Sequence, residues 1–260
     1  MQTGKWGIGA LMFGMAFQSV AAERCTARSG ASVVPLVELY TSEGCSSCPP
    51  ADRWLTQQLQ DRRANWLAFH VDYWDDIGWP DRFASPAYSQ RQRQRVGAHG
   101  GDTVYTPQVM LGADVRASWR ADNRFDKALM LQSRQPAKAG LAMQLQPQGG
   151  DWQLQLGAAR ASKAAATTHK SDGAQVWLAL YADDQATQVR AGENRGETLH
   201  HDRVVRRLYG PWPLTQALSQ QVKFKPDIGQ WGLTAFVQDA GGNTLQSLNL
   251  SPSGCDAPRG

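Results

Sequence analysis

The sequence predicts an α/β domain followed by an all-β, sandwich-like domain. A strand–helix–strand succession occupies residues 33–72, and short β-rich runs separated by turn residues fill the chain after Pro136. A strand–helix–strand unit places its two strands in parallel, whereas short strands at regular spacing are typical of a β-sandwich. The chain has 260 residues, of which 42% are hydrophobic, so it can bury a core for both units.

The first 22 residues have the pattern of a secretory signal peptide. Lys5 gives the positive start, an apolar run follows at 6–17, and small residues precede a cleavage site that is expected after Ala22. The apolar run is shorter than the ~20 residues that a membrane span needs; an uncleaved membrane anchor is the alternative. We therefore expect a periplasmic or secreted protein that has no membrane contact after signal cleavage.

The first half of the exported chain is expected to follow the order β-α-β-α-β-β-α. The apolar run at 33–40 indicates a buried central strand, and Pro49 and Pro50 indicate a helix start, because the first helical turn tolerates proline. Ser85 followed by Pro86 indicates the start of a second helix. The other expected elements are strands at 66–72, 108–111 and 115–119 and a helix that ends near Ser133.

Three segments follow from this pattern. Residues 1–22 form the signal peptide, 23–136 the α/β domain, and 137–260 the β-rich, sandwich-like domain. The β-rich runs of the last segment lie at 141–145, 152–156, 176–181, 204–208 and 232–237. The formal charge of +4 is spread over 27 basic and 23 acidic residues without a dense basic run, so no nucleic-acid partner is expected.

The four cysteines all lie in the exported part of the chain. Cys45 and Cys48 form a CxxC motif, and Cys25 and Cys255 lie near the two ends. Disulfides persist in oxidising compartments, and four cysteines allow three pairings. We favour the bridges 45–48 and 25–255, because the ends of compact folds often lie close together. The alternative leaves both terminal cysteines unpaired.

The CxxC motif sits between an expected buried strand and an expected helix start. The amide groups and the dipole at a helix N-terminus favour a thiolate. Thr106 and Pro107 precede a later strand and complete the pattern. We expect thiol–disulfide exchange at Cys45 and Cys48 and no metal site. The alternatives are an inert structural disulfide and thiolate ligation of a soft metal such as Cu(I).

These residues carry a resemblance to a known family. The stretch 33–133 resembles a thioredoxin-like fold, with the CSSC motif at the active-site position and Thr106-Pro107 at the cis-proline segment. The block 37–52 (VELYTSEGCSSCPPAD) is similar to DUF1223, a family of exported thioredoxin-like bacterial proteins of unassigned function. Residues 70–75 and 105–108 fit that family as well.

The resemblance implies a role for each residue of the site. Cys45 would attack a substrate disulfide, and Cys48 would resolve the mixed disulfide. Thr106 and Pro107, joined by a cis bond, would bind the substrate. Glu38 is a possible proton acceptor, the alternative being a carboxylate at a sheet edge or in solvent.

The motif also departs from the thioredoxin pattern. Gly44 stands where that family usually has Trp, and the Ser46-Ser47 pair contains neither Pro nor His. We therefore expect a less acidic Cys45 thiol than in a strong oxidase, with its sulfur more accessible than that of Cys48.

Together these observations predict an exported thiol–disulfide oxidoreductase. Its substrate would be a protein or small-molecule thiol or disulfide, its redox partner is unknown, and it needs no dissociable cofactor. The alternatives are a redox-inert, thioredoxin-like binding protein with a structural CxxC disulfide, and a Cu(I) carrier.

Overall fold

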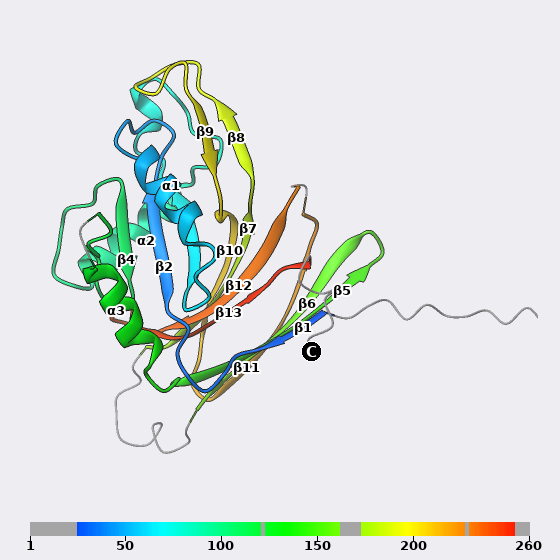
Figure 1. Ribbon diagram of the computed structural model, residues 1–260. Coiled ribbons are helices and arrows are strands. Elements are labelled where there is room, and N and C mark those ends of the chain that lie inside the picture. Colours follow the sequence, from blue (N-terminus) through cyan, green and yellow to red (C-terminus); the bar gives the residue numbers. More distant parts are fainter. Residues whose placement is uncertain (1–24, 121–122, 162–172, 227–228, 253–260) are drawn as a thin grey trace, which may run out of the picture.

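The structure is a computed structural model that describes residues 25–120, 123–161, 173–226 and 229–252 (Figure 1). Within these ranges the chain forms thirteen strands and three α-helices. The expected signal peptide at 1–22 and Cys255 lie outside the described residues. No helix in the described ranges is long and apolar enough to cross a bilayer.

Seven strands form one sheet, whose order is β13-β12-β7-β10-β3-β2-β4. They are β2 (Leu36–Thr41), β3 (Asn65–His70), β4 (Gln108–Leu111), β7 (Gln175–Ala182), β10 (Val204–Pro213), β12 (Trp231–Gln238) and β13 (Thr244–Leu250). A four-stranded sheet has the order β1-β5-β6-β11, and β8 pairs with β9 in a separate hairpin. These strands are β1 (Cys25–Arg28), β5 (Ala139–Gln148), β6 (Asp151–Arg160), β8 (Gln185–Gln188), β9 (Thr198–His201) and β11 (Ala217–Phe224).

The helices begin where the sequence signals place them. They are α1 (Pro49–Gln58), α2 (Pro86–Gly97) and α3 (Arg124–Ser133), with a short 3-10 turn, η1, at Asp75–Ile77. Ser85 caps α2 by accepting a hydrogen bond from the Ala87 N–H at 3.3 Å. Helix α1 connects β2 to β3, and these strands pair in parallel with Leu39 opposite Ala68. The predicted strand–helix–strand unit is therefore confirmed.

The predicted fold class, an α/β thioredoxin-like domain followed by an all-β, sandwich-like domain, is wrong. Strand β10, from the second half, pairs in parallel with β3 through Val204 and Ala68, so strands from both halves share one sheet. The described chain is mostly β-sheet with three helices, and the expected strand at 115–119 is a turn and loop. The edge of β3 needs a partner for its backbone groups, and local patterns do not reveal that this partner lies far along the chain.

The two faces of β2 are covered by different helices. Side chains alternate between the faces of a strand. Val37 and Leu39 pack with residues of α1 and α3, whereas Leu36 and Tyr40 pack with residues of α2. Figure 1 shows α1 at one side of this part of the sheet and α2 behind it. This alternation decides which buried side chains can lie close to the start of α1.

The opposite end of the seven-stranded sheet packs against the four-stranded sheet. Their shared core includes Leu145 of β5, Leu178 of β7 and Leu233 of β12, which are all buried. The resulting pair of layers is the sandwich-like part of the molecule (Figure 1). It anchors β7 and β10, and β10 in turn closes the edge of β3.

Candidate functional site

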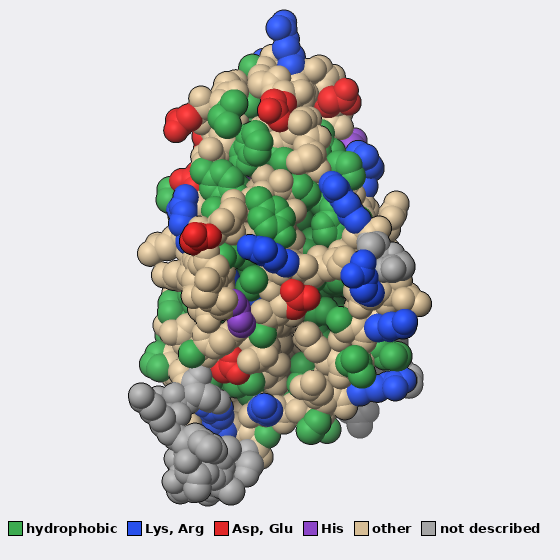
Figure 2. All heavy atoms as spheres, turned by 90° about the vertical axis from the view of Figure 1, so that its left-hand side faces the viewer, with side chains coloured by type: hydrophobic (Ala, Val, Ile, Leu, Met, Phe, Trp, Pro, Cys, Tyr) green, Lys and Arg blue, Asp and Glu red, His purple; other side chains and the backbone are tan. Residues whose placement is uncertain are grey.

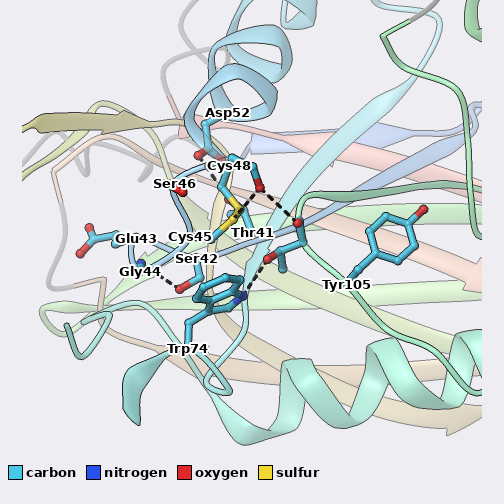
Figure 3. Close-up of a disulfide and its surroundings, with 12 residues drawn as sticks. Thr41, Ser42, Glu43, Gly44, Cys45, Ser46, Cys48, Asp52, Trp74 and Tyr105 are labelled. Atoms are coloured by element: carbon cyan, nitrogen blue, oxygen red, sulfur yellow. Dashed lines mark hydrogen bonds between the residues drawn. A yellow bond between two sulfur atoms is a disulfide. The ribbon is translucent and has the colours of Figure 1, made fainter. Parts of the chain in front are cut away.

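The CxxC motif forms a disulfide at the start of α1 (Figure 3). The Cα atoms of Cys45 and Cys48 are 5.4 Å apart. Cys48 is the N-cap of α1, and its backbone N–H donates to the Cys45 carbonyl oxygen at 3.1 Å. Pro49 can follow Cys48 without the loss of a hydrogen bond, because the first N–H groups of a helix have no intrahelical acceptor. The predicted bridge between Cys45 and Cys48 is confirmed, and it lies at a helix N-terminus as expected.

The predicted bridge between Cys25 and Cys255 stays a prediction. Cys25 is buried at the start of β1, where it lies opposite Leu145 of β5. Cys255 lies outside the described residues.

The Thr106–Pro107 segment lies beside the disulfide, and its peptide bond is cis, as predicted. The Ser47 hydroxyl donates to the Thr106 carbonyl oxygen at 3.5 Å and lies 3.3 Å from the Cys45 sulfur. The indole N–H of Trp74 donates to the Thr106 hydroxyl at 2.7 Å. The structure thus brings together the cysteines and the residues expected to bind substrate.

Trp74 also explains the glycine at position 44. A Cβ atom on Gly44 would lie 3.1 Å from the Cβ atom of Trp74, which is tighter than an ordinary contact. Trp74 comes from the loop after β3, and its carbonyl oxygen would lie 3.4 Å from the same Cβ atom. Gly44 permits this close approach.

The surface beside the site is partly apolar. Tyr105, which precedes the cis-proline segment, is 41% exposed, and Figure 3 shows its ring directed away from the disulfide. Figure 2 views the left-hand side of Figure 1 and shows hydrophobic side chains gathered in the upper part of that face, among scattered basic and acidic side chains.

Neither cysteine is exposed, so the structure does not show the expected greater accessibility of Cys45 over Cys48. Both residues have 0% of their surface exposed. The loop between β8 and β9 lies against the cysteine segment: the Asn194 side-chain amide donates to the Glu43 carbonyl oxygen at 2.8 Å and to the Cys45 carbonyl oxygen at 3.1 Å. The Ser46 N–H donates to the Glu193 carboxylate at 3.0 Å. We call residues 189–197 the covering loop.

Glu38 lies on the α2 face of the sheet, away from α1. Its carboxylate accepts hydrogen bonds from Arg91 at 2.9 and 3.0 Å, from Arg95 at 2.7 Å, from the Tyr40 hydroxyl at 2.8 Å and from Gln238 at 2.9 Å. Burial alone would raise the pKa of Glu38, but the two arginines lower it to about 2. A carboxylate held in this way is a poor proton acceptor, so the structure does not support the expected role of Glu38.

A different carboxyl group, Asp52, lies next to the disulfide. Asp52 is on α1, four residues after Cys48, and it is buried. Residues four apart lie on the same face of a helix. The Thr41 hydroxyl at the end of β2 donates to the Asp52 carboxylate at 3.2 Å. Burial raises the pKa of Asp52 above its ordinary value, although His201 and His70 oppose that shift.

Asp52 belongs to a buried group of five titratable side chains, which we call the acid–histidine cluster; its members are Glu43, Asp52, His70, Asp81 and His201. His70 Nδ1 lies 2.6 Å from the Asp81 carboxylate. The rings of His70 and His201 are 4.9 Å apart. His201 Nδ1 is 3.8 Å from Asp52, and His201 Nε2 is 3.6 Å from Glu43. The cluster combines residues from β3, α1, β9 and the connecting loops.

Several atoms of this cluster lack hydrogen-bond partners. Within the described ranges, no partner lies within hydrogen-bond reach of His70 Nε2, of either ring nitrogen of His201, or of Glu43 Oε1. Buried polar groups are normally hydrogen-bonded, so such exceptions call for an explanation. Among the residues that the structure describes, no three His, Cys, Asp or Glu side chains are arranged to hold a metal ion.

Sequence reasoning missed most of this cluster. Asp52 could have been found, because it follows Cys48 by one helical turn within an otherwise core-facing stretch. His201 and the covering loop could not, because nothing local indicates that β8 and β9 pack against α1. The structure therefore places buried titratable side chains beside the disulfide.

Two solved structures have a similar fold over most of this chain. A crystal structure of a protein from Agrobacterium tumefaciens has 23% sequence identity and a TM-score of 0.59, and the match covers 86% of this chain and 96% of that one. HBP35 of Porphyromonas gingivalis has 14% identity and a TM-score of 0.62, with 85% of this chain and 76% of that one covered. A search of curated proteins gives no match.

The family comparison is more specific. The family model described as "Protein of unknown function (DUF1223)" matches residues 36–238, a range that contains the disulfide, the cis-proline segment and the whole acid–histidine cluster. The chain therefore belongs to the DUF1223 family.

Proposed function

We propose that this protein is a thiol–disulfide oxidoreductase that acts through the Cys45–Cys48 pair. The observation that carries the proposal is the placement of this disulfide at the N-terminus of α1, beside the cis Thr106–Pro107 segment. This local arrangement supports a relation to thioredoxin-like proteins at the level of the site, although the overall fold differs. The substrate would be a protein or small-molecule thiol or disulfide.

The proposed reaction begins at Cys45. A substrate thiolate forms a bond to the Cys45 sulfur, the Cys45–Cys48 bond breaks, and Cys48 leaves as a thiolate. The N-terminal amides of α1 stabilise negative charge on sulfur. The Ser47 hydroxyl, 3.3 Å from the Cys45 sulfur, can donate a hydrogen bond when Cys45 becomes a thiolate. A second thiolate then resolves the mixed disulfide.

We further propose that the protein works in an oxidising compartment. The disulfide itself supports this location, because such bonds persist in the periplasm and outside the cell. The signal-like residues 1–22 agree with export. No dissociable cofactor enters the proposed reaction, and no redox partner is assigned.

The proposal is tested by the reduction potential of the pair and by its two single variants. In glutathione buffers the potential should lie above about −300 mV, the level below which structural disulfides typically fall. Cys48→Ser should accumulate glutathione on Cys45, because the resolving thiol is missing, whereas Cys45→Ser should not form the corresponding adduct on Cys48. Mass spectrometry of the intact protein measures both.

One observation favours a second candidate, a redox-inert binding protein with a structural disulfide. Both cysteines are fully buried beneath the covering loop. In that case the potential would fall below about −300 mV, and neither single variant would form a glutathione adduct at a native-like rate. The same measurements therefore separate the two functions.

A further inference from the structure

The acid–histidine cluster adjoins the disulfide through Asp52, whose backbone N–H donates to the Cys48 carbonyl oxygen at 3.2 Å. Charged side chains are rarely buried unless they are paired. His70 and Asp81 meet this condition at 2.6 Å. The contacts among the other three are looser: His201 lies 3.8 Å from Asp52 and 3.6 Å from Glu43, which is within ion-pair range but beyond hydrogen-bond distance. These three groups are close enough to influence one another's charge but are not locked together.

The position of Asp52 connects this cluster to the reacting sulfur atoms. Cys48 caps α1 and Asp52 lies one helical turn later, so both project from the same helix face. Both are buried. Figure 3 shows Asp52 on α1 next to Cys48, on the side of the disulfide opposite Trp74. A proton that moves to or from Cys48 therefore has Asp52 as the neighbouring buried acid.

We propose that Asp52 transfers the proton of Cys48 during thiol–disulfide exchange, and that His201 is a positioning residue that sets the charge of Asp52. This inference rests on the proposed function and names the residues that serve it. It assigns a catalytic task to a carboxyl group from α1 and a supporting task to a histidine from β9. The expected acceptor, Glu38, is excluded from this task by its four partners on the other face of the sheet.

The proposed step balances as follows. A dithiol substrate attacks Cys45 through one thiolate, and the electron pair of the broken S–S bond goes to Cys48. Asp52, in its neutral form, gives its proton to Cys48. The second substrate thiolate then displaces Cys45 from the mixed disulfide, and Cys45 takes a proton from solvent. The substrate is oxidised to a disulfide, the protein pair is reduced by two electrons, and two protons pass from the substrate to the pair by way of solvent and Asp52. In the reverse direction Cys48 returns its proton to the Asp52 carboxylate.

The groups that face Asp52 come from four elements. His201 faces it from β9, His70 from β3, the Thr41 hydroxyl from β2, and Asp81 from the segment after η1. Glu43 faces His201 from the other side. A positive charge on either histidine favours the Asp52 carboxylate, as does the Thr41 hydrogen bond, whereas burial and Asp81 favour the neutral acid. Asp52 can therefore gain or lose a proton without large rearrangement of its neighbours.

The experiment measures reduction of the oxidised protein by dithiothreitol, with each rate constant divided by the thiolate fraction of the reagent. In the wild type this corrected rate should fall as pH rises through the pKa of Asp52, because the neutral acid is the proton donor. Asp52→Asn should remove this dependence and lower the rate roughly 10²-fold, the lower range for general acid catalysis. Asp126→Asn is the matched control, since Asp126 is an exposed partner of Arg63.

Two further variants keep the test informative if Asp52→Asn folds poorly. Thr41→Val removes a hydrogen bond to the carboxylate, and His201→Gln removes the ring whose electrostatic effect lowers the pKa of Asp52, so each should move the pH dependence to higher pH. A purely structural role would change stability but not this midpoint. An unchanged midpoint in both variants, or a wild-type pH profile in Asp52→Asn, would overturn the inference while leaving the proposed function intact. A wild-type protein that dithiothreitol cannot reduce, with a potential below about −300 mV, would instead overturn the proposed function.

Discussion

Two buried groups of charged side chains flank strand β2, and they are organised in opposite ways. On the α2 face, both oxygens of Glu38 accept hydrogen bonds, and the partners include Arg91 and Arg95. On the α1 face, the acid–histidine cluster contains one close pair, His70 with Asp81, and three groups at looser distances. In the first arrangement, two arginines lower the pKa of Glu38 to about 2, whereas in the second several ring and carboxylate atoms have no hydrogen-bond partner among the described residues.

The difference shows how one strand serves both the fold and the site. We call Glu38 and its four hydrogen-bond partners, Tyr40, Arg91, Arg95 and Gln238, the Glu38 group. This group ties β2 to α2 and, through Gln238, to β12 of the second half. Arginine does not lose its proton in the range where proteins are stable, so this group acts as a permanent connection. The acid–histidine cluster instead joins β3, α1 and β9 beside the disulfide, where the proposed proton transfer would use a change of protonation.

The largest effect should come from breaking the Glu38 group. Glu38→Gln leaves two buried arginines without their shared carboxylate, and removal of one partner from a buried ion pair costs about 3–5 kcal/mol. The free energy of unfolding, measured with a chemical denaturant, should fall by that amount. Asp126→Asn, at an exposed ion pair, should stay within about 0.5 kcal/mol of the wild type. If Glu38→Gln lowered the free energy of unfolding by no more than this control does, the Glu38 group could not be a stabilising connection.

A second effect should appear in the pH dependence of stability. Burial opposes ionisation of Asp81, but His70 and its hydrogen bond lower the Asp81 pKa to about 2. A lowered carboxyl pKa stabilises the fold above the unfolded pKa, so about 2–3 kcal/mol should be lost as pH falls from ~4 to ~2. The pKa of Glu38 is also about 2, so its contribution to the free energy of unfolding should be lost over the same pH range.

The two groups should differ at higher pH. Burial alone would lower the pKa of His70, but Asp81, Asp52 and Glu43 raise it above the ordinary value. A raised histidine pKa stabilises the fold below the unfolded value of ~6.5, and this contribution is lost as pH rises through the folded pKa. His70→Gln should therefore remove an alkaline decline in stability that the wild type shows. Persistence of that decline in His70→Gln would assign it to a group outside the acid–histidine cluster.

The same contrast separates what the sequence could predict from what it could not. The helix starts at Pro49 and Ser85, the pairing of β2 with β3, the Cys45–Cys48 bridge and the cis bond at Pro107 all depend on residues close in sequence, and all were predicted. The pairing of β10 with β3 depends on packing between distant segments, and this pairing is part of the mostly β-sheet architecture that contradicts the predicted fold class.

Glu38 illustrates the limit most clearly. A buried carboxylate on the strand before the CxxC motif is an obvious candidate for proton transfer. Its side chain nevertheless points to the α2 face, because neighbouring residues Val37 and Leu39 face α1. The length and path of the turn after β2 decide which face meets the disulfide, and that path is a property of the folded loop. The position of Asp52 near Cys48 could have been predicted, because the two residues are one helical turn apart in sequence. The position of His201 could not, because it depends on where β9 packs in the folded protein.

The smallest expected effect concerns access to the site. The Glu38 group is buried within the core, but the disulfide and the acid–histidine cluster are separated from solvent in part by the covering loop. Asn194 donates two hydrogen bonds to backbone oxygens of this segment. Asn194→Ala removes both, and a typical hydrogen bond contributes about 0.5–1.5 kcal/mol. Opening of the loop should become roughly 10-fold more favourable, since about 1.4 kcal/mol corresponds to a factor of ten.

That change should be visible as a faster reaction of the disulfide. The rate of reduction of Asn194→Ala by dithiothreitol should rise roughly 10-fold at constant pH, if opening precedes attack on Cys45. Asn243→Ala is the matched control, because Asn243 bonds to Asp239 in a turn outside the site. The midpoint of the pH dependence should stay that of the wild type, because the loop controls access while Asp52 controls the proton. An unchanged rate in Asn194→Ala would show that another segment limits access. A shifted midpoint would show that Asn194 acts on the cluster itself, and the separation of access from proton transfer would then have to be abandoned.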